Sequence, residues 1–385
     1  MKQKKESNTI ENSAIQNALK RALNSLVSAP AYKNPEAAYI ATISELQDDT
    51  PVEEKQWEQL YEVAKNIRLL APWEHLNDSQ RITLLLSDRD EPVYIVVMGN
   101  GGMTYGIGIY YGYDSLRRLL KLNESEIDEN NMTVAFEQRC INLYFGDREE
   151  LELRDKKVIK QLGLKFRGKN EWPYFRSMKP GFMPWYINRD EAELAISALQ
   201  NFAMAFLAYS KISFKTDFQS GETFLRFYDV DSAMWYNTAM KMPLIPFIIP
   251  KMIITNDVLM AQLKKKKRNQ AKIGLIITYI SMPVLENKDE RPKMPRIAIL
   301  VDMEKGMIID QAMDIGDIGS AVIDLLTSYI KNNGRPEFFA VMDDYTGDYI
   351  EDFATKLEIK LVEDKRLIAI SNLILEQFDK FDNIT

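Results

Sequence analysis

The hydrophobic pattern is most regular in the last third of the chain. Runs of apolar residues over 273–280, 297–302 and 307–313 predict three β-strands, the last two joined by a glycine turn. A helical spacing follows, and Asn333 and Gly334 end it. The residues on the predicted buried side of this helix are Ile318, Ala321, Val322, Leu325, Leu326, Tyr329 and Ile330.

Two further strands and two helices complete this region. The pattern predicts strands over 338–342 and 359–362, with a helix between them and a last helix over 367–378. The order is βββαβαβα. Three strands that pair as a meander, followed by strands joined through helices, predict a mixed sheet covered by helices. This is the strand order of the ribonuclease H-like fold.

The N-terminal part of the chain predicts an α+β region. A helix is predicted over 54–70, followed by strands over 82–87, 93–98 and 103–111, the last two forming a hairpin around a glycine-rich turn. A long apolar helix is predicted from the Asn188 region to Tyr209. The fold class is therefore mixed, with an N-terminal α+β region and a C-terminal α/β domain.

These elements predict four segments along the chain. Residues 1–30 form a polar N-terminal arm, and residues 31–230 form the α+β domain, in which a break near residue 165 would give two subdomains. Residues 231–270 form a connector rich in proline and lysine, and residues 271–385 form the ribonuclease H-like domain.

Composition narrows the class of protein. The chain has 385 residues, 46% of them hydrophobic, with a net charge of -7, which fits a folded protein of more than one domain. The longest apolar tract, residues 242–254, is broken by three prolines and is too short for a membrane helix. Cys140 is the only cysteine, so an intramolecular disulfide is excluded. We expect a soluble protein of the cytoplasm, with no membrane partner.

Two long motifs resemble the core of retroviral-type integrases and transposases. They are LVDMEKGMIIDQAM and NNGRPEFFAVMDDYTGDYIEDFATKLEIKLV, and the resemblance covers residues 273–378. It implies three carboxylates that hold two divalent metal ions, Mg²⁺ or Mn²⁺. Asp343 or Asp344 matches the second carboxylate and Glu376 the third.

The first carboxylate of that set is missing. The first-strand stretch IGLIITYISM contains no acidic residue, and Asp302 lies on the second predicted strand. Asp302 or Asp310 would have to replace the missing carboxylate if the domain were a nuclease. The alternative interpretation of Asp343 and Asp344 is that they cap the following helix, which we favour.

A second resemblance covers most of residues 55–380. The segments VMGNGGMTYGIGIYYG, WPYFRSMKPGFMPWYI and NGRPEFFAV resemble a family of bacterial proteins known as domains of unknown function. This resemblance implies no activity and no catalytic residues.

Two segments are candidate binding sites. Trp172, Arg176 and Trp185 lie in a tract that would form a groove for a peptide or an unpaired base, or would pack between domains. The basic run Lys264, Lys265, Lys266, Lys267 and Arg268 would contact nucleic-acid phosphates, or would be a solvated loop, which we favour.

The leading functional hypothesis is a non-catalytic binding or regulatory protein with a protein partner. No complete catalytic or metal-ligand set is recognisable, and no cofactor is predicted. The alternative is a divalent-metal-dependent nuclease or strand-transfer relative that uses the C-terminal carboxylates. A third hypothesis is a partner-dependent component of a mobile-element or defence system.

Overall fold

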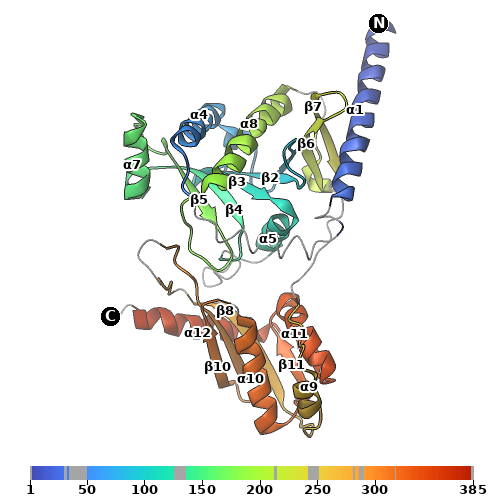
Figure 1. Cartoon of the computed structure of the whole chain (residues 1–385), viewed down its shortest axis with the longest axis vertical. Helices are drawn as coiled ribbons and strands as arrows, with labels where there is room; N and C mark the ends of the chain where they lie inside the picture. Colours follow the sequence, from blue (N-terminus) through green and yellow to red (C-terminus); the bar gives the residue numbers. More distant parts are fainter. Residues whose placement is uncertain are drawn as a thin grey trace. The chain divides into compact units, whose positions relative to one another are not determined.

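The chain divides into two compact units, which are described separately. The computed structural model describes residues 2–29, 33, 50–124, 136–211, 215–241, 251–280, 282–285, 290–316 and 318–382 (Figure 1). Unit 1 comprises Met1–Lys121, Gln138–Lys179 and Pro184–Phe247, and unit 2 comprises Leu122–Glu137, Pro180–Met183 and Ile248–Thr385. Each unit contains one mixed sheet.

The sheet of unit 1 has seven strands in the order β5-β4-β3-β2-β1-β6-β7. Its strands are β1 (Ile82–Leu85), β2 (Val93–Met98), β3 (Tyr105–Tyr111), β4 (Cys140–Gly146), β5 (Trp172–Met178), β6 (Glu222–Asp229) and β7 (Met234–Lys241). All neighbours are antiparallel except β1 and β6, which are parallel. The predicted hairpin is confirmed as β2 and β3.

Helices cover both faces of this sheet. They are α1 (Lys2–Ser28), α4 (Glu54–Leu70), α5 (Gly112–Glu124), α7 (Leu153–Gln161) and α8 (Arg189–Lys211), with short 3₁₀ turns at Pro72–Glu74, Arg148–Glu150 and Phe218–Ser220. α4 and α8 pack together over one face, α5 lies over the middle of the other, and α1 runs beside β6 and β7 (Figure 1).

α8 is the central core helix of unit 1. Ala198, Leu199 and Phe202 are fully buried against the sheet and α4, which is the burial expected for apolar residues three to four positions apart. Among the described residues, α8 alone is long and apolar enough to cross a membrane, and half of its apolar window is buried in the unit. Its packing in the core of unit 1 therefore accounts for its apolar composition.

The predicted helix over 54–70 is confirmed as α4, and local signals explain both of its ends. The side chains of Glu53 and Gln56 form a capping box at the start. Ala71 ends the helix in the left-handed region at φ 44°, and Pro72 follows.

Two strands of this sheet do not follow from the hydrophobic pattern. β5 contains Pro173 and β7 has few fully apolar residues, so neither resembles an internal strand. Both are edge strands, where a missing backbone N–H or an exposed side chain is tolerated. The predicted connector 231–270 therefore contains β7, and residues 242–250 of it lie outside the described residues.

The sheet of unit 2 has five strands in the order β10-β9-β8-β11-β12. They are β8 (Lys272–Tyr279), β9 (Arg296–Asp302), β10 (Met307–Asp314), β11 (Phe338–Val341) and β12 (Lys360–Glu363). The helices are α9 (Asp257–Lys264), α10 (Ile318–Asn333), α11 (Asp344–Lys356) and α12 (Arg366–Asp382). From β8 onward, the predicted order βββαβαβα and the mixed sheet are confirmed.

Both faces of this second sheet are buried. α9, α10 and α11 pack on one face, where Leu275, Leu300 and Phe339 are fully buried, and α12 packs on the other. Gly274 explains how closely α12 approaches, because a Cβ there would lie 2.5 Å from a methyl group of Leu367.

A charged contact holds α1 on unit 1. The Arg21 guanidinium donates to both carboxylate oxygens of the buried Asp229, at 2.9 and 2.6 Å. The hydrogen bond from Arg21, followed by the one from Ser232, lowers the pKa of Asp229 well below its usual range. Apolar packing of Ala18 against β6 completes the contact.

We predict that Asp229→Asn releases α1 at neutral pH. The amides of α1 should exchange with deuterium faster than in the wild type, measured by mass spectrometry, while the exposed neighbour Asp231→Asn should change them little. Because the folded pKa of Asp229 is lowered, its contribution is present above the unfolded pKa of about 3.9 and is lost as the pH falls below it. The stability difference between wild type and Asp229→Asn should therefore shrink below about pH 4; a pH-independent difference would contradict the role of this ion pair.

Candidate ligand-binding site

A pocket of about 260 Å³ opens in unit 1 at one end of the sheet. β3 and β5 end there, β4 begins there, and α5 and α8 both start beside it. Its charged and hydroxyl-bearing lining residues include Arg89, Tyr111, Ser115, Arg139, Lys179 and Glu191.

Close turns place the start of α5 at the pocket. β3 passes directly into α5 through Gly112, whose φ of +82° is strained for any side chain. The carboxylate of Glu91 occupies the space that a Cβ would take, 2.9 Å away, and accepts the Tyr113 N–H at 3.2 Å. The first turn of α5 is therefore fixed against the loop between β1 and β2.

A reciprocal cap fixes the start of α8. Asn188 accepts the Glu191 N–H at 2.8 Å, and Glu191 accepts the Asn188 N–H at 3.0 Å. The other oxygen of Glu191 accepts the Ser177 hydroxyl at 2.5 Å, which ties α8 to β5. Glu191 is therefore used structurally, although it also lines the pocket.

Three cations from separate segments line this pocket. Arg89 comes from the loop after β1, Arg139 precedes β4, and Lys179 follows β5 and is only 5% exposed. Arg139 and Lys179 also contact other protein groups. The Nε atom of Arg89 is buried without a hydrogen-bond partner, and its nearest carboxylate is Asp88 at 3.8 Å.

The electrostatics of the pocket favour an anionic group. The positive ends of two helix dipoles add to the three cations. Asp190 and Glu191 oppose them, but the Glu191 carboxylate already accepts two hydrogen bonds. A carboxylate or phosphate group is the ligand that this donor set would bind.

Cys140 lines the same pocket but is not prepared as a nucleophile. Burial raises the pKa of its thiol to about 12, so the thiol is protonated at neutral pH. His75, the single histidine of the sequence, lies against Phe206 with ring centroids 5.8 Å apart. Neither residue contributes a catalytic pair here.

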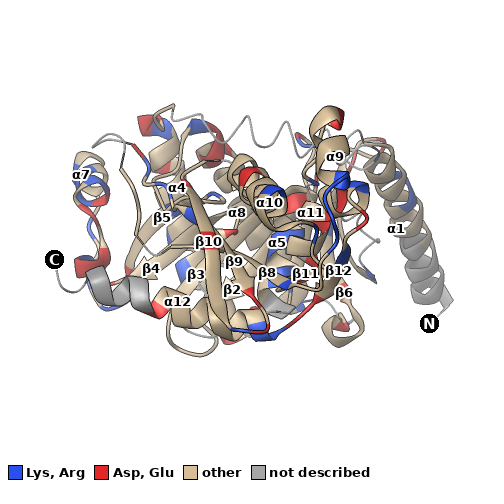
Figure 2. Cartoon of the chain, turned by 90° about the horizontal axis from the view of Figure 1, so that it is seen from below, with Lys and Arg blue, Asp and Glu red and all other residues tan. Residues whose placement is uncertain are grey.

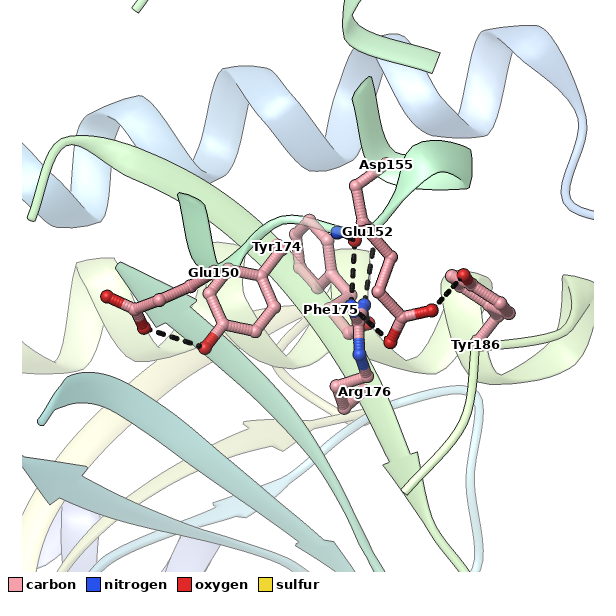
Figure 3. A network of polar contacts seen from close by, with 7 residues as sticks. All are labelled: Glu150, Glu152, Asp155, Tyr174, Phe175, Arg176 and Tyr186. Atoms are coloured by element: carbon pink, nitrogen blue, oxygen red, sulfur yellow. Dashed lines mark hydrogen bonds and ion pairs between the residues drawn. The ribbon is translucent and has the colours of Figure 1, made fainter. Parts of the chain in front are cut away.

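Arg176 on β5 is the centre of a polar network of unit 1 (Figure 3). Its guanidinium donates to both oxygens of Asp155 at 3.0 and 2.7 Å, to Glu152 at 3.2 Å and to the Phe175 carbonyl at 2.7 Å. Glu152 also accepts the hydroxyl of Tyr186. Burial lowers the pKa of Arg176, but the hydrogen bond and charge of Asp155 outweigh it and raise that pKa overall.

The network joins α7 to the edge strand β5. The residues of the predicted aromatic site make contacts within unit 1. Arg176 lies 4.9 Å from the ring centre of Tyr174 and 5.1 Å from that of Tyr186. Trp172 packs against Phe166. Trp185 pairs through its backbone with Ser177 on β5. These contacts give Arg176, Trp172 and Trp185 intramolecular roles, and a ligand role for them stays a prediction.

The candidate carboxylates of unit 2 lie at different places on its sheet. Asp302 ends β9 and is level with Ile273 on β8, which is level with Phe339 on β11. Asp343 lies four residues beyond Phe339, so it is about 13 Å further along the sheet and two strands away. Paired metal ions lie about 4 Å apart, and this separation does not allow Asp302 and Asp343 to share them.

The remaining candidates do not join them. Asp310 on β10 is level with Val341, but three strand spacings, about 14 Å, separate the two strands. Asp343 accepts the N–H and hydroxyl of Thr346, both at 2.8 Å, and caps α11. Asp344 is exposed in the first turn of α11, and Glu376 is exposed on α12. Among the described residues, no group of three His, Cys, Asp or Glu could hold a metal ion.

The basic run follows α9 in unit 2 (Figure 2). Lys264 pairs with Glu358 at 2.7 Å. Lys266 donates to the Lys331 carbonyl at 2.8 Å, and Arg268 donates to the Glu358 carbonyl at 2.6 Å, near the ends of α10 and α11. Cations at helix C-termini are stabilising. Lys265 and Lys267 are exposed, and nucleic-acid binding by the run stays a prediction.

The three cations of the pocket were not predicted as a site from the sequence. Lys179 lies inside the aromatic tract, but Arg89 and Arg139 are isolated residues in ordinary loops. The pairing of β2, β3, β4 and β5 brings the three segments together. No local sequence motif indicates such a site.

Two family models of unassigned function match separate parts of the chain. Residues 57–226 match the model described as Domain of unknown function (DUF7309), and residues 259–377 match the model described as Domain of unknown function (DUF6930). Together these domains cover most of the chain, and no curated protein matches it. The predicted resemblance to domains of unknown function is confirmed at this level.

One solved structure shows a weak likeness. It is the cryoEM structure of the simian T-cell lymphotropic virus intasome in complex with PP2A regulatory subunit B56 gamma, with 17% sequence identity and a TM-score of 0.23. The match covers 31% of this chain and 45% of that chain. A TM-score this low does not define a shared fold.

We predict that Asp155→Ala strongly destabilises unit 1. The side chains of Arg176 and Asp155 are only 8% and 7% exposed, and the substitution leaves a buried charge without its partner. Chemical denaturation should give a loss of about 3–5 kcal/mol. Glu152→Gln, which removes the charge of a 53% exposed partner but keeps the side-chain oxygen that caps α7, should cost less than about 1 kcal/mol. Equal losses for the two variants would contradict the assignment of Asp155 as the main partner.

We predict that Cys140 reacts slowly with iodoacetamide in the folded protein. With a thiol pKa of about 12, the thiolate fraction at pH 8 is about 10³-fold lower than for an exposed cysteine. Mass spectrometry should detect alkylation only after denaturation. Rapid modification of the native protein at pH 8 would show that the thiol is not buried as described.

Proposed function

We propose that the chain is a non-catalytic binding protein whose unit 1 takes a small anionic ligand in the pocket beside α5 and α8. The observation that carries this proposal is the convergence of Arg89, Arg139 and Lys179 on one pocket. The three cations outnumber the two carboxylates of the lining, Asp190 and Glu191, so a bound anion would add a favourable charge interaction there.

The size of the pocket limits the ligand. Pockets for drug-sized molecules occupy roughly 300–1,000 Å³, and this one is at or below the lower end at about 260 Å³. Inorganic phosphate, a short dicarboxylate or the phosphate end of a larger molecule would fit. A bound anion would add to, or replace, the present neighbours of Arg139 and Lys179.

For unit 2 we propose a ribonuclease H-like arrangement without the metal-dependent activity. The strand order β10-β9-β8-β11-β12, with β9 antiparallel to β8 and with β11 and β12 parallel to it, supports this arrangement. The wide separation of Asp302, Asp310 and Asp343 argues against the predicted nuclease or strand-transfer alternative. A scaffold or docking role is what remains for this unit.

The proposal also includes a reducing cellular compartment. A single buried thiol, Cys140, suits a reducing compartment such as the bacterial cytoplasm. The binding role would then be regulatory or would connect the ligand to a protein partner.

We predict that the purified protein binds inorganic phosphate, sulfate or succinate, measured by isothermal titration calorimetry at low ionic strength. Lys179→Met and Arg89→Gln should each weaken binding at least about tenfold, which corresponds to about 1.4 kcal/mol of lost charge-assisted contact. A preference for succinate over phosphate would identify the ligand as a carboxylate.

The matched control is Lys241→Met, which removes an exposed cation at the far edge strand of the same unit. Its affinity should equal that of the wild type. Lys179 is buried, so Lys179→Met could fail to fold. Arg89→Gln tests the site independently, because Arg89 lies in a loop and is partly exposed. No binding of any of the three anions at about ten millimolar would reject the proposal, since weak sites have millimolar affinities.

A further inference from the structure

The edge strand β10 of unit 2 exposes a row of large apolar side chains. Met307, Ile308, Ile309 and Met313 are 62%, 49%, 40% and 54% exposed, respectively. Among the described residues, β10 pairs with β9 on one side and has no strand on its other side. Its outer edge therefore has no strand partner and carries exposed hydrophobic surface. The Gln311 N–H donates to the Asp310 carboxylate at 2.9 Å, a contact that a pairing strand would replace.

This edge lacks most of the features that normally prevent strand pairing. Edge strands are usually short or carry lysine or proline. The opposite edge, β12, fits that description, with four residues that include Lys360 and Glu363. β10 has eight residues with neither lysine nor proline, and only the bulge between Ile308 and Asp310 interrupts it.

The register with β9 assigns the side chains of β10 to the two faces. Ile308, Gln311 and Met313 lie opposite strand residues that face α12, on one side of the sheet. Asp310 and Ala312 lie opposite residues that face α10 and α11, on the other side. The large apolar side chains of Ile308 and Met313 thus share one face, and Asp310 lies on the other.

A second copy of the same strand fits this pattern. The bulge leaves Ile309 without a position in the ladder. In an antiparallel pair centred on Gln311, with Ile309 skipped in each copy, Ile308 of one copy lies opposite Met313 of the other, on the same face and on both sides of the centre. Asp310 then lies opposite Ala312. A register centred one residue later would set Asp310 against Asp314, which like charges disfavour.

We propose that two copies of the chain associate through β10, in a twofold antiparallel pairing centred on Gln311. The pairing is isologous, so each copy gives and receives the same contacts and the interface closes at two. It extends the five-stranded sheets of two molecules into one sheet of ten strands. It buries Ile308 and Met313, and it is independent of the anion site in unit 1.

Sedimentation velocity of the full chain over a range of concentrations tests this pairing. The wild type should form a dimer in a concentration-dependent way, and the variant with Ile308→Lys and Met313→Lys should remain monomeric. Both side chains are about half exposed, so the fold should tolerate the change. Val258→Lys on α9, at a residue 69% exposed in the same unit, is the matched control and should dimerise like the wild type.

A disulfide tests the register itself. Gln311→Cys places two cysteines directly opposite each other across the axis, within the Cα separation of about 4.4–6.8 Å that a disulfide spans. Mild oxidation should give a covalent dimer with Gln311→Cys and little with Met307→Cys. A wild type that stays monomeric at the highest concentration, a dimer that survives the double lysine variant, or equal cross-linking at both positions would overturn the proposal.

Discussion

The packing of α8 against the seven-stranded sheet is the contact on which unit 1 depends. Its 23 residues bury a continuous apolar side between the sheet and α4, with Ala198, Leu199 and Phe202 fully enclosed. Burial of this kind stabilises by about 25 cal/mol for each Å² removed from water. The start of the helix is thereby held at one end of the sheet, where the Asn188 and Glu191 cap and the Ser177 contact fix its orientation.

The pocket is a consequence of that placement. α5 begins at the same end of the sheet as α8 because β3 passes into it through Gly112. Two strand ends place Arg139 and Lys179 at the pocket, and the loop between β1 and β2 places Arg89 there. Elsewhere in unit 1, the pair of Arg176 and Asp155 anchors α7 to β5, and this pairing occupies the Arg176 guanidinium.

Periodicity predicted the elements whose burial is one-sided and regular. α4 and α10 match their predicted ranges because apolar residues recur at helical spacing and clear signals end each helix. β5 and β7 were missed because Pro173 and the partly exposed residues of β7 are compatible with a strand only at a sheet edge. The site was harder to predict, since the convergence of Arg89, Arg139 and Lys179 depends on which strands pair.

In unit 2, too, the order of the strands and helices was easier to predict than the positions of individual side chains. The order of its strands and helices was predicted from the sequence, but the distance between Asp302 and Asp343 depends on register, which local sequence does not specify. Because β9 runs antiparallel to β8, its final residue lies level with the beginning of β8. Asp302 and Asp343, which belong to the same predicted set of carboxylates, are therefore separated along the sheet.

The function proposed for unit 1 requires its pocket to bind an anion, and a crystal structure of the full chain grown with excess phosphate tests this most directly. Tetrahedral density should then appear within hydrogen-bond distance of Arg89, Arg139 or Lys179, beside the first turn of α8. Phosphate bound only elsewhere, with water alone in this pocket at a concentration that saturates binding in solution, would contradict it.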